Sequence, residues 1–245
     1  MAKSFECPFF DSTFVLPYCR GVQMIALLQI LAATCLADSP PAKPKIQADH
    51  TAYEAITGES ADEEKTVWDD FYKERHHIFG KEPVSFLKDN IEMIPRGKAF
   101  VPAMGEGRNA LYLAKRGFEV DGNDISEVAV DKTLAEAKTA HVTLQTTVAD
   151  LNKYNYPENH YDQIVVSLFY QKSLLPRFKK ALKKGGFILF YNRVDTHDKE
   201  TKTSPDDFLV KPAELKESMK DFQIKTYREY VDQGFHVVGL LARKP

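Results

Sequence analysis

The sequence predicts an α/β fold in which a mostly parallel sheet is covered by helices on both faces. Three observations predict it. Strand-like and helical segments alternate between residues 98 and 194, the fourth and fifth strand-like segments are apolar enough to be central, and the chain ends in two strand-like segments separated by Gln233 and Gly234. Such alternation is typical of parallel sheets, and a short turn joins antiparallel strands. We therefore expect seven strands, the last two forming an antiparallel hairpin.

Composition limits the number of domains and the kind of partner. With 245 residues, 43% of them hydrophobic and 28% charged, the chain can bury one ordinary core, so one main domain is expected. The formal net charge is −2, and lysines and acids are interspersed throughout. Because a nucleic-acid-binding surface is usually broad and basic, we expect no nucleic-acid partner.

The N-terminal region contains a short apolar run, Met24–Ala37, which follows Arg20 and precedes DSPPAKPK. This pattern is typical of a signal peptide, and cleavage after Ala37 would make the mature chain periplasmic or secreted. The alternative is that residues 1–37 are an ordinary N-terminal extension of a cytoplasmic protein. A run of 14 residues is too short to span a bilayer comfortably, so no stable membrane span is expected in the mature chain.

The three cysteines, Cys7, Cys19 and Cys35, all lie in the segment that cleavage would remove. The mature chain would then have no disulfide, thiolate metal site or catalytic cysteine. Acylation of Cys35 is a weaker alternative. Residues 38–65 are rich in proline, alanine, threonine and acids and predict a flexible linker, so the folded domain is expected over 66–245.

Two helices are expected before the first strand. The segment 61–79 begins with acids and has apolar residues at helical spacing, and the segment 83–94 opens with Pro83. Trp68 is expected to pack in the core or in a lid rather than to stack on a substrate. The inward-facing residues are expected to be Val67, Phe71, His77 or Ile78, Phe86, Leu87 and Ile91.

The alternating region follows these helices. Gly117 is expected to close its first helix, Ser126 to cap the second, and Gly185–Gly186 to stop the third. After a polar stretch at 195–207, a helix is expected at 212–221. Strands are expected at 98–104, 118–124, 142–150, 161–169, 187–194, 222–232 and 235–245, and helices at 107–117, 126–140 and 173–186.

A glycine-rich turn follows the first strand. The sequence GEGRNA, residues 105–110, satisfies G-x-G-x-x-A, and Asp124 follows Gly105 by 19 residues at the end of the second strand. Glycines let a backbone approach a ligand closely, and a carboxylate at a strand end accepts hydrogen bonds from ribose hydroxyls. The motif alone admits a nicotinamide or flavin dinucleotide. However, a dehydrogenase usually needs a further substrate domain, and only about 120 residues follow Asp124.

The stretch Phe100–Ser126 resembles the first two motifs of class I S-adenosylmethionine-dependent methyltransferases. It is especially similar to their tellurite-resistance and thiopurine methyltransferase-like branch, from WDDFYKE through FGKEPVSFL to the terminal LLARKP. The resemblance implies a three-layer Rossmann-like fold, S-adenosylmethionine as cofactor, and methyl transfer to a small molecule such as a thiol or a chalcogen oxyanion. Two alternatives stay open: a non-catalytic binding protein on this fold, and an NAD-dependent oxidoreductase.

The resemblance also implies roles for individual residues. Asp124 would hold the ribose hydroxyls, Ile125 would pack against the adenine, and Asp150 would lie near the adenine amino group. Ser167 and Leu168 would line the methionine side. The cofactor-binding residues expected in this way are Met104, Gly105, Glu106, Gly107, Asn109, Asp124, Ile125, Asp150, Leu151 and Ser167.

The first strand departs from the family pattern. Family members commonly have an acid at the position of Val101 and glycine at the position of Ala103. The acid helps to hold the cofactor's ammonium group, so that contact must come from elsewhere or be absent. Glu106, in the turn, is the nearest candidate to replace it. Asp124 has an alternative role as a helix-capping acid before SEVAV.

Candidates for the acceptor side come from two places. Tyr72, His76 and His77 precede the sheet and are expected to form a lid, while Tyr170 and Arg193 leave its carboxyl edge. His76, His77 and Tyr170 would take a proton from a hydroxyl or amine acceptor, and Arg193 would orient an oxyanion. The alternative for each is a surface or packing role. No metal-ligand cluster is visible, since adjacent histidines on a helix point about 100° apart.

Overall fold

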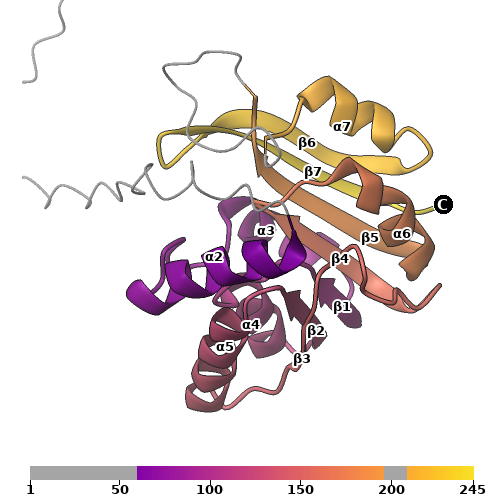
Figure 1. Ribbon diagram of the computed structural model, residues 1–245. Helices are drawn as coiled ribbons and strands as arrows, with labels where there is room; N and C mark the ends of the chain where they lie inside the picture. The colour runs from indigo at the N-terminus through magenta and orange to yellow at the C-terminus, as the bar shows by residue number, and fades with distance from the viewer. Residues whose placement is uncertain (1–59, 196–208) are drawn as a thin grey trace, which may run out of the picture. The chain divides into compact units, whose positions relative to one another are not determined.

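A seven-stranded sheet with the order β3-β2-β1-β4-β5-β7-β6 organises the fold (Figure 1). Strands β1 to β5 pair in parallel, and β7 pairs antiparallel with both β5 and β6. This topology confirms the mostly parallel sheet and the antiparallel C-terminal hairpin. The strands are β1 (Lys98–Val101), β2 (Glu119–Asp124), β3 (Gln145–Val148), β4 (Tyr161–Ser167), β5 (Leu182–Arg193), β6 (Gln223–Asp232) and β7 (Phe235–Arg243).

The computed structural model describes residues 60–195 and 209–245. The predicted signal segment 1–37, most of the predicted linker 38–65 and nearly all of the polar stretch 195–207 lie outside the described residues. Within the described ranges, no helix has the length and apolar character needed to cross a membrane.

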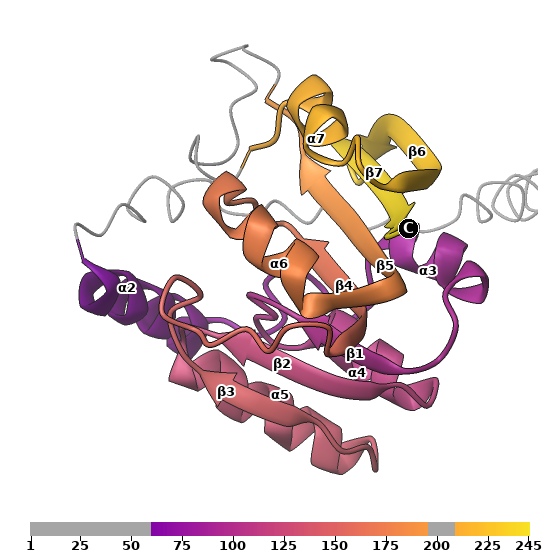
Figure 2. The same ribbon diagram turned by 90° about the vertical axis from the view of Figure 1, so that its right-hand side faces the viewer.

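Helices cover both faces of the sheet, which gives three layers (Figure 2). One core cluster joins α3, α4 and α5 to the sheet, and a second joins α6 and α7 to the opposite face. The helices are α2 (Ala61–Glu74), α3 (Ser85–Asn90), α4 (Arg108–Lys115), α5 (Glu127–Thr139), α6 (Leu175–Ala181) and α7 (Pro212–Ser218), with 3-10 turns η2 (Ile91–Met93) and η3 (Lys172–Leu174).

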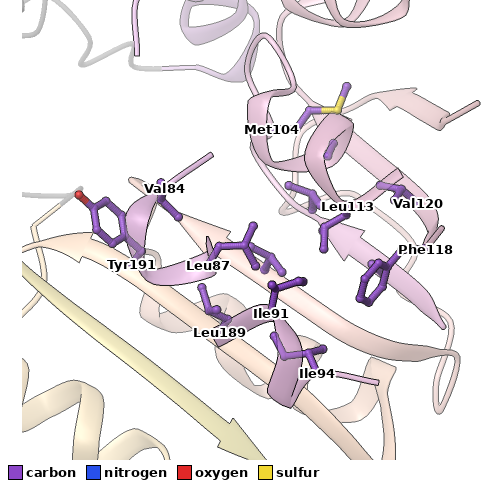
Figure 3. Packing of buried hydrophobic residues seen from close by; sticks show 14 of the residues in the cluster. Val84, Leu87, Ile91, Ile94, Met104, Leu113, Phe118, Val120, Leu189 and Tyr191 are labelled. Atoms are coloured by element: carbon purple, nitrogen blue, oxygen red, sulfur yellow. The ribbon is translucent and has the colours of Figure 1, made fainter. Parts of the chain in front are cut away.

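The first core cluster forms where apolar residues of one helix face meet alternate strand residues. Leu87 and Ile91 pack with Leu189 of β5, while Leu113 of α4 lies near Val120 of β2 (Figure 3). Phe86, Leu87 and Ile91 are all buried, as the helical spacing predicts. Burying side chains of this size stabilises the fold by about 1.5–3 kcal/mol each, so this cluster fixes the strands that carry the site.

The first helix begins at the predicted residue but ends earlier than predicted. Ser60 accepts a hydrogen bond from the backbone N–H of Glu63, whose side chain accepts one from the backbone N–H of Ser60, so a capping box starts α2 at Ala61. The last part of the predicted 38–65 linker therefore belongs to the folded domain. The helix ends at Glu74 because Arg75 is extended, and His77 has a φ of 53°. The prediction of a helix through residue 79 was wrong.

The glycine pair after α6 also has a different role from the predicted helix stop. The helix ends at Ala181, and Gly185 and Gly186 lie within β5, where they exchange backbone hydrogen bonds with Lys244. Pairing with the distant C-terminus therefore outweighs the local helical pattern. The remaining elements differ from the prediction only at their ends.

The predicted hairpin is confirmed. Gln233 has a φ of 51° and Gly234 a φ of 87°, which is the backbone of a two-residue turn with two left-handed positions. Phe235 and Asp232 are paired on either side of it.

Candidate functional site

A cleft lies outside the carboxyl ends of the parallel strands. Its lining includes Met104 after β1, Asp124 at the end of β2, Asp150 after β3 and Ser167 at the end of β4. Strand β1 lies between β2 and β4, so the chain order reverses here, and open α/β sheets bind ligands at such a switch point. The cleft is partly open to solvent, so a ligand can enter it.

The glycine turn forms the floor of the cleft. Gly105 has a φ of 55°, and its backbone N–H donates to Asp124 Oδ2 at 2.7 Å. A Cβ at Gly105 would lie 2.7 Å from the hydroxyl of Tyr72, so glycine is needed here for both conformation and space. Gly107 has a φ of 77° and faces Thr133 instead; it does not line the cleft.

Asp124 is a buried carboxylate at the centre of the site, with a 6% exposed fraction. Its Oδ1 accepts the backbone N–H of Ser126 at 3.0 Å, while Oδ2 accepts that of Gly105. Burial raises the pKa of Asp124 to about 6, although these backbone donors act to lower it. Asp124 is therefore mainly ionised at neutral pH. It is not the helix cap, since the Ser126 side chain accepts from the backbone N–H of Ala129.

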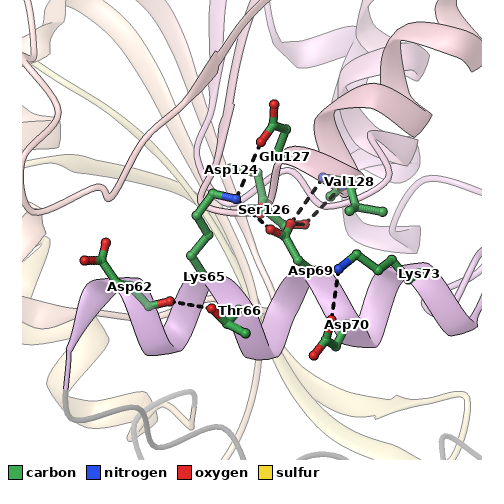
Figure 4. Close-up of polar contacts among 11 residues, drawn as sticks. Asp62, Lys65, Thr66, Asp69, Asp70, Lys73, Asp124, Ser126, Glu127 and Val128 are labelled. Carbon is green, nitrogen blue, oxygen red and sulfur yellow. Dashed lines mark hydrogen bonds and ion pairs between the residues drawn. The ribbon is translucent and has the colours of Figure 1, made fainter.

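Helix α2 attaches to this site through Asp69 (Figure 4). Asp69 Oδ1 accepts hydrogen bonds from the Ser126 hydroxyl at 2.6 Å and from the backbone N–H of Val128 at 3.2 Å, at the start of α5. Lys65 pairs with Asp69 Oδ2 at 2.6 Å. Burial alone would raise the pKa of Asp69, but the hydrogen bonds from Lys65 and Ser126 outweigh it and lower that pKa. Asp69 thus anchors α2 next to the cleft.

Replacing Asp69 with alanine is expected to lower the free energy of unfolding by about 1–2 kcal/mol, because the first turn of α5 loses an acceptor. The melting temperature should fall by about 2–8 °C, measured by circular dichroism. Asp70→Ala is the matched control: its exposed pair with Lys73 is worth less than about 1 kcal/mol. Equal losses in the two variants would contradict this role of Asp69.

Asn109 and Ser167 join α4 to the end of β4 inside the cleft. Asn109 Nδ2 donates to Ser167 Oγ at 2.7 Å, and Asn109 Oδ1 accepts the backbone N–H of Val84 at 3.0 Å. Asn109 is buried and both residues line the cleft. This network holds the Ser167 hydroxyl at the cleft wall, next to the left-handed Leu168, whose φ is 51°.

The two departures in the first strand have different consequences. Val101 is 1% exposed, belongs to the first core cluster and does not line the cleft. Ala103 lines it with a φ of 45°, in the left-handed region that favours glycine. Glu106 lines the cleft, but its Oε2 accepts the backbone N–H of Ile78 at 3.0 Å and its Oε1 lies 3.4 Å from Lys132 Nζ. Glu106 is thus already engaged.

Aromatic side chains form one wall of the cleft. Trp68 and Tyr72 of α2 are stacked with their ring centroids 5.7 Å apart, and both line the cleft with Phe79. Trp68 therefore packs on a neighbouring ring at the edge of the cleft, which agrees with the lid position expected from sequence. Arg108 lines the same cleft, and its Nη1 donates to the carbonyl of Phe79.

A pair of acids lies at another part of the lining. Burial raises the pKa of Glu64, and the nearby charge of Asp150 adds to the shift, while a hydrogen bond with Trp68 opposes it. Asp150 Oδ1 accepts the backbone N–H of Asn152 at 2.8 Å. These carboxylates give the cleft a polar edge beside Ile125 and Leu151.

The structure places every predicted cofactor-binding residue except Gly107 in the lining of one cleft. Tyr72, which was expected in the lid, and Leu168, which was expected on the methionine side, also line this cleft. Among the described residues, no group of three or more histidines, cysteines or acids could hold a metal ion.

The four catalytic candidates lie outside this lining. His76 is exposed, and His77 Nε2 lies 3.6 Å from Glu136 on α5. Tyr170 is buried in the second core cluster, and burial raises its pKa, which makes it a poor base. Arg193 is buried, and its guanidinium lies 3.8 Å from the ring centroid of Phe235. The structure therefore does not bring these four residues into the lining of the cleft.

Several lining residues were not predicted as site residues. Arg108 could have been found, because it directly follows the glycine turn. Five more lie beside predicted residues in the segments after β1, β3 and β4: Ala103, Ala149, Asn152, Phe169 and Gln171. Only the tertiary fold brings Glu64, Trp68, Phe79 and Gly80 to the cleft. Together they are Glu64, Trp68, Phe79, Gly80, Ala103, Arg108, Ala149, Asn152, Phe169 and Gln171.

Solved structures share this fold. The crystal structure of TehB from Haemophilus influenzae superposes with a TM-score of 0.60 at 23% identity, covering 73% of this chain and 67% of that one. At this identity the likeness concerns the fold alone.

Sequence relatives give a more specific result. The curated "Probable S-adenosyl-L-methionine-dependent methyltransferase TehB" of Haemophilus influenzae is 30% identical over 148 residues, which are 58% of this chain and 51% of the relative. The chain thus spans about half the length of that relative. "Hemagglutinin 1" of Eikenella corrodens is 27% identical over 210 residues, 76% of this chain and 69% of the relative.

The family model described as "Tellurite resistance protein TehB" matches residues 66–238, which is more than half of the chain and includes the whole cleft apart from Glu64. The chain belongs to the tellurite resistance protein TehB family.

Proposed function

We propose that this protein is an S-adenosylmethionine-dependent methyltransferase acting on a small molecule. The observation that carries the proposal is the buried, ionised Asp124 beside the glycine turn, at the switch point of a sheet with this strand order. Membership of the TehB family and the printed name of the Haemophilus relative support it.

The lining fits the cofactor by its hydrogen-bond acceptors and its apolar side chains. Backbone N–H groups of Gly105, Ser126 and Ile125 interact with the Asp124 carboxylate. A carboxylate has about four acceptor sites, so acceptor capacity remains for the ribose. Ile125 and Leu151 supply apolar contacts for a flat base, and Asp150 supplies an acceptor for its amino group. The missing Cβ of Gly105 leaves room for the Tyr72 hydroxyl, and Tyr72 lines the cleft. Since Val101 is buried and Glu106 is engaged, we propose that no carboxylate of the turn holds the ammonium group.

When bound, S-adenosylmethionine supplies a methyl group already activated by the sulfonium charge. The protein therefore needs mainly to orient the acceptor and exclude water. The stacked Trp68 and Tyr72 would cover the reacting groups, while the hydroxyl of Ser167 is held in place by Asn109. These side chains align the acceptor and do not take its proton.

The acceptor we propose is a soft anion or lone-pair donor, such as a thiolate or a chalcogen oxyanion. The described lining contains no histidine, cysteine or lysine, and its carboxylates already accept hydrogen bonds. Acceptors that must lose a proton to a base are therefore disfavoured. Arg108 contributes a positive charge to the lining, which favours an anionic acceptor.

The test is the formation of S-adenosylhomocysteine from S-adenosylmethionine with selenite, tellurite, small thiols, an amine or a phenol as acceptor. Turnover with an oxyanion or thiol, and much less with amine or phenol, is expected. Preference for the amine or phenol would contradict the acceptor class. Tight binding of NAD would instead support the oxidoreductase. Failure to bind any of these nucleotides would support the non-catalytic binding protein.

The affinity for S-adenosylhomocysteine should fall as the pH drops below about 6. Protonation of Asp124 removes acceptor sites for the ribose, and burial together with the charge of Asp69 raises its pKa to about 6. Isothermal titration calorimetry between pH 5 and pH 8 measures this fall. Asp124→Asn should bind weakly, with little change over this range; a fall of the same size in that variant would assign the titration to another group.

A further inference from the structure

The N-terminal part of the fold covers the cleft. We call helix α2 together with residues 75–80 the N-terminal cover, because five of its residues line the cleft: Glu64, Trp68, Tyr72, Phe79 and Gly80. The rest of the lining comes from the sheet and the segments that follow its strands. The cleft is therefore complete only when the cover is correctly placed.

Backbone groups of the cover are held by side chains from the glycine turn, α4 and α5. Glu106 accepts the backbone N–H of Ile78 at 3.0 Å, and Arg108 donates to the carbonyl of Phe79. Lys132 Nζ, from α5, donates to the carbonyls of Tyr72 and Arg75. These contacts join the glycine turn and α5 directly to the cover.

The carbonyls bound by Lys132 are at the C-terminal end of α2. Helix α2 ends at Glu74 with an extended Arg75, and the last carbonyls of a helix have no partners within it. A cation at this end is favourable for the helix dipole, more so when it is partly buried. The Lys132 side chain is 19% exposed and lies 3.4 Å from Glu106.

Lys132 differs from Glu106 and Arg108 in its position. Both of those residues line the cleft, whereas Lys132 does not. Its amino group lies behind the lining, where it contacts Glu106 and the end of α2. A change at Lys132 would leave every lining side chain in the protein.

We propose that Lys132 is a positioning residue for nucleotide binding: by binding the carbonyl end of α2 and pairing with Glu106, it fixes the N-terminal cover against the glycine turn. The proposal rests on the proposed function, in which this cleft holds the cofactor. Nucleotide binding to the cleft and correct placement of the cover are then coupled. Because such coupling is reciprocal, the bound nucleotide also stabilises the cover.

The variant Lys132→Met keeps the length of the side chain but removes its charge and donors. We expect it to bind S-adenosylhomocysteine about tenfold more weakly, as measured by isothermal titration calorimetry at 25 °C on folded protein. Lys132→Arg should restore most of the affinity because it keeps donors for the carbonyls. The matched control is Lys138→Met, an exposed lysine on the same helix, which should bind as the wild type does.

A second readout follows the cover itself. Limited chymotrypsin cleavage at Trp68, Phe71, Tyr72 or Phe79, identified by mass, reports how often the cover opens. Cleavage there should be several-fold faster in Lys132→Met than in wild type without ligand. S-adenosylhomocysteine should slow it more in wild type than in the variant. A purely structural lysine would lower the melting temperature without changing affinity at 25 °C.

Affinity within twofold of wild type, together with unchanged cleavage of the cover, would overturn the role of Lys132. If the wild type does not bind S-adenosylhomocysteine, the proposed function fails, and the cleavage rate without ligand alone decides whether Lys132 holds the cover.

The interaction energy between the Lys132 and Glu106 side chains can be measured by combining Lys132→Met with Glu106→Gln. The double variant should then lose less affinity than the sum of the two single changes.

Discussion

Replacing Asp124 with alanine is expected to weaken S-adenosylhomocysteine binding by about a hundredfold or more. A hydrogen bond to a charged group contributes about 1.5–3 kcal/mol, and two ribose hydroxyls would lose their acceptor. The loss should be measured by isothermal titration calorimetry at neutral pH, where the Asp124 carboxylate is mainly ionised, since its pKa is about 6.

The Asp124→Ala variant also leaves the backbone N–H groups of Gly105 and Ser126 without their carboxylate acceptor. Its melting temperature should therefore fall, and affinity must be compared at a temperature where circular dichroism shows the variant to be folded. Asp131→Ala, which removes an exposed acid from α5, is the matched control and should bind normally. Undiminished affinity in Asp124→Ala would show that the ribose lies elsewhere.

Gly105→Ala is expected to lower both stability and nucleotide affinity. The left-handed backbone costs a residue with a Cβ about 1–2 kcal/mol, and that Cβ would lie only 2.7 Å from the Tyr72 hydroxyl. Because Tyr72 lines the cleft, its displacement should weaken S-adenosylhomocysteine binding about tenfold and lower the melting temperature by about 2–8 °C. Calorimetric titration and thermal unfolding measure the two effects.

Two further variants separate the backbone strain from the steric overlap. Gly234→Ala has the same kind of strain, at a φ of 87°, but a Cβ there has nothing within 4 Å, so it should cost stability alone. Adding Tyr72→Phe to Gly105→Ala removes the overlapping hydroxyl and should recover part of the affinity. If the effects of Gly105→Ala and Tyr72→Phe on the free energy of binding were strictly additive, the proposed overlap would be contradicted.

The fold was largely predictable because its signals are local. Alternating apolar strands, the Ser126 cap and the Gln233–Gly234 turn each depend on neighbouring residues, and each forms as predicted. The end of α2 and the role of Gly185 were not predictable in this way. The first is bound by Lys132, far along the chain, and the second pairs with the C-terminus.

The cleft shows the same division. Its floor follows the glycine motif and the strand ends, so Asp124, Asp150 and Ser167 all line it. Of the lid expected from Tyr72, His76 and His77, only Tyr72 lines the cleft, and its placement depends on how α2 packs on α5 through Asp69. The sequence also offers His76 and His77, next to this helix, as catalytic candidates. In the structure the helix ends at Glu74, and His77 Nε2 lies 3.6 Å from Glu136.

The central claim is that a sulfonium nucleoside binds across the carboxyl ends of β1, β2 and β4 with its ribose on Asp124. A crystal structure of the protein with S-adenosylhomocysteine tests this most directly. We expect both ribose hydroxyl oxygens within hydrogen-bond distance of the Asp124 carboxylate, and the adenine between Ile125 and Leu151. Ordered product bound elsewhere, or a cleft filled by the protein's own side chains at saturating product, would contradict it.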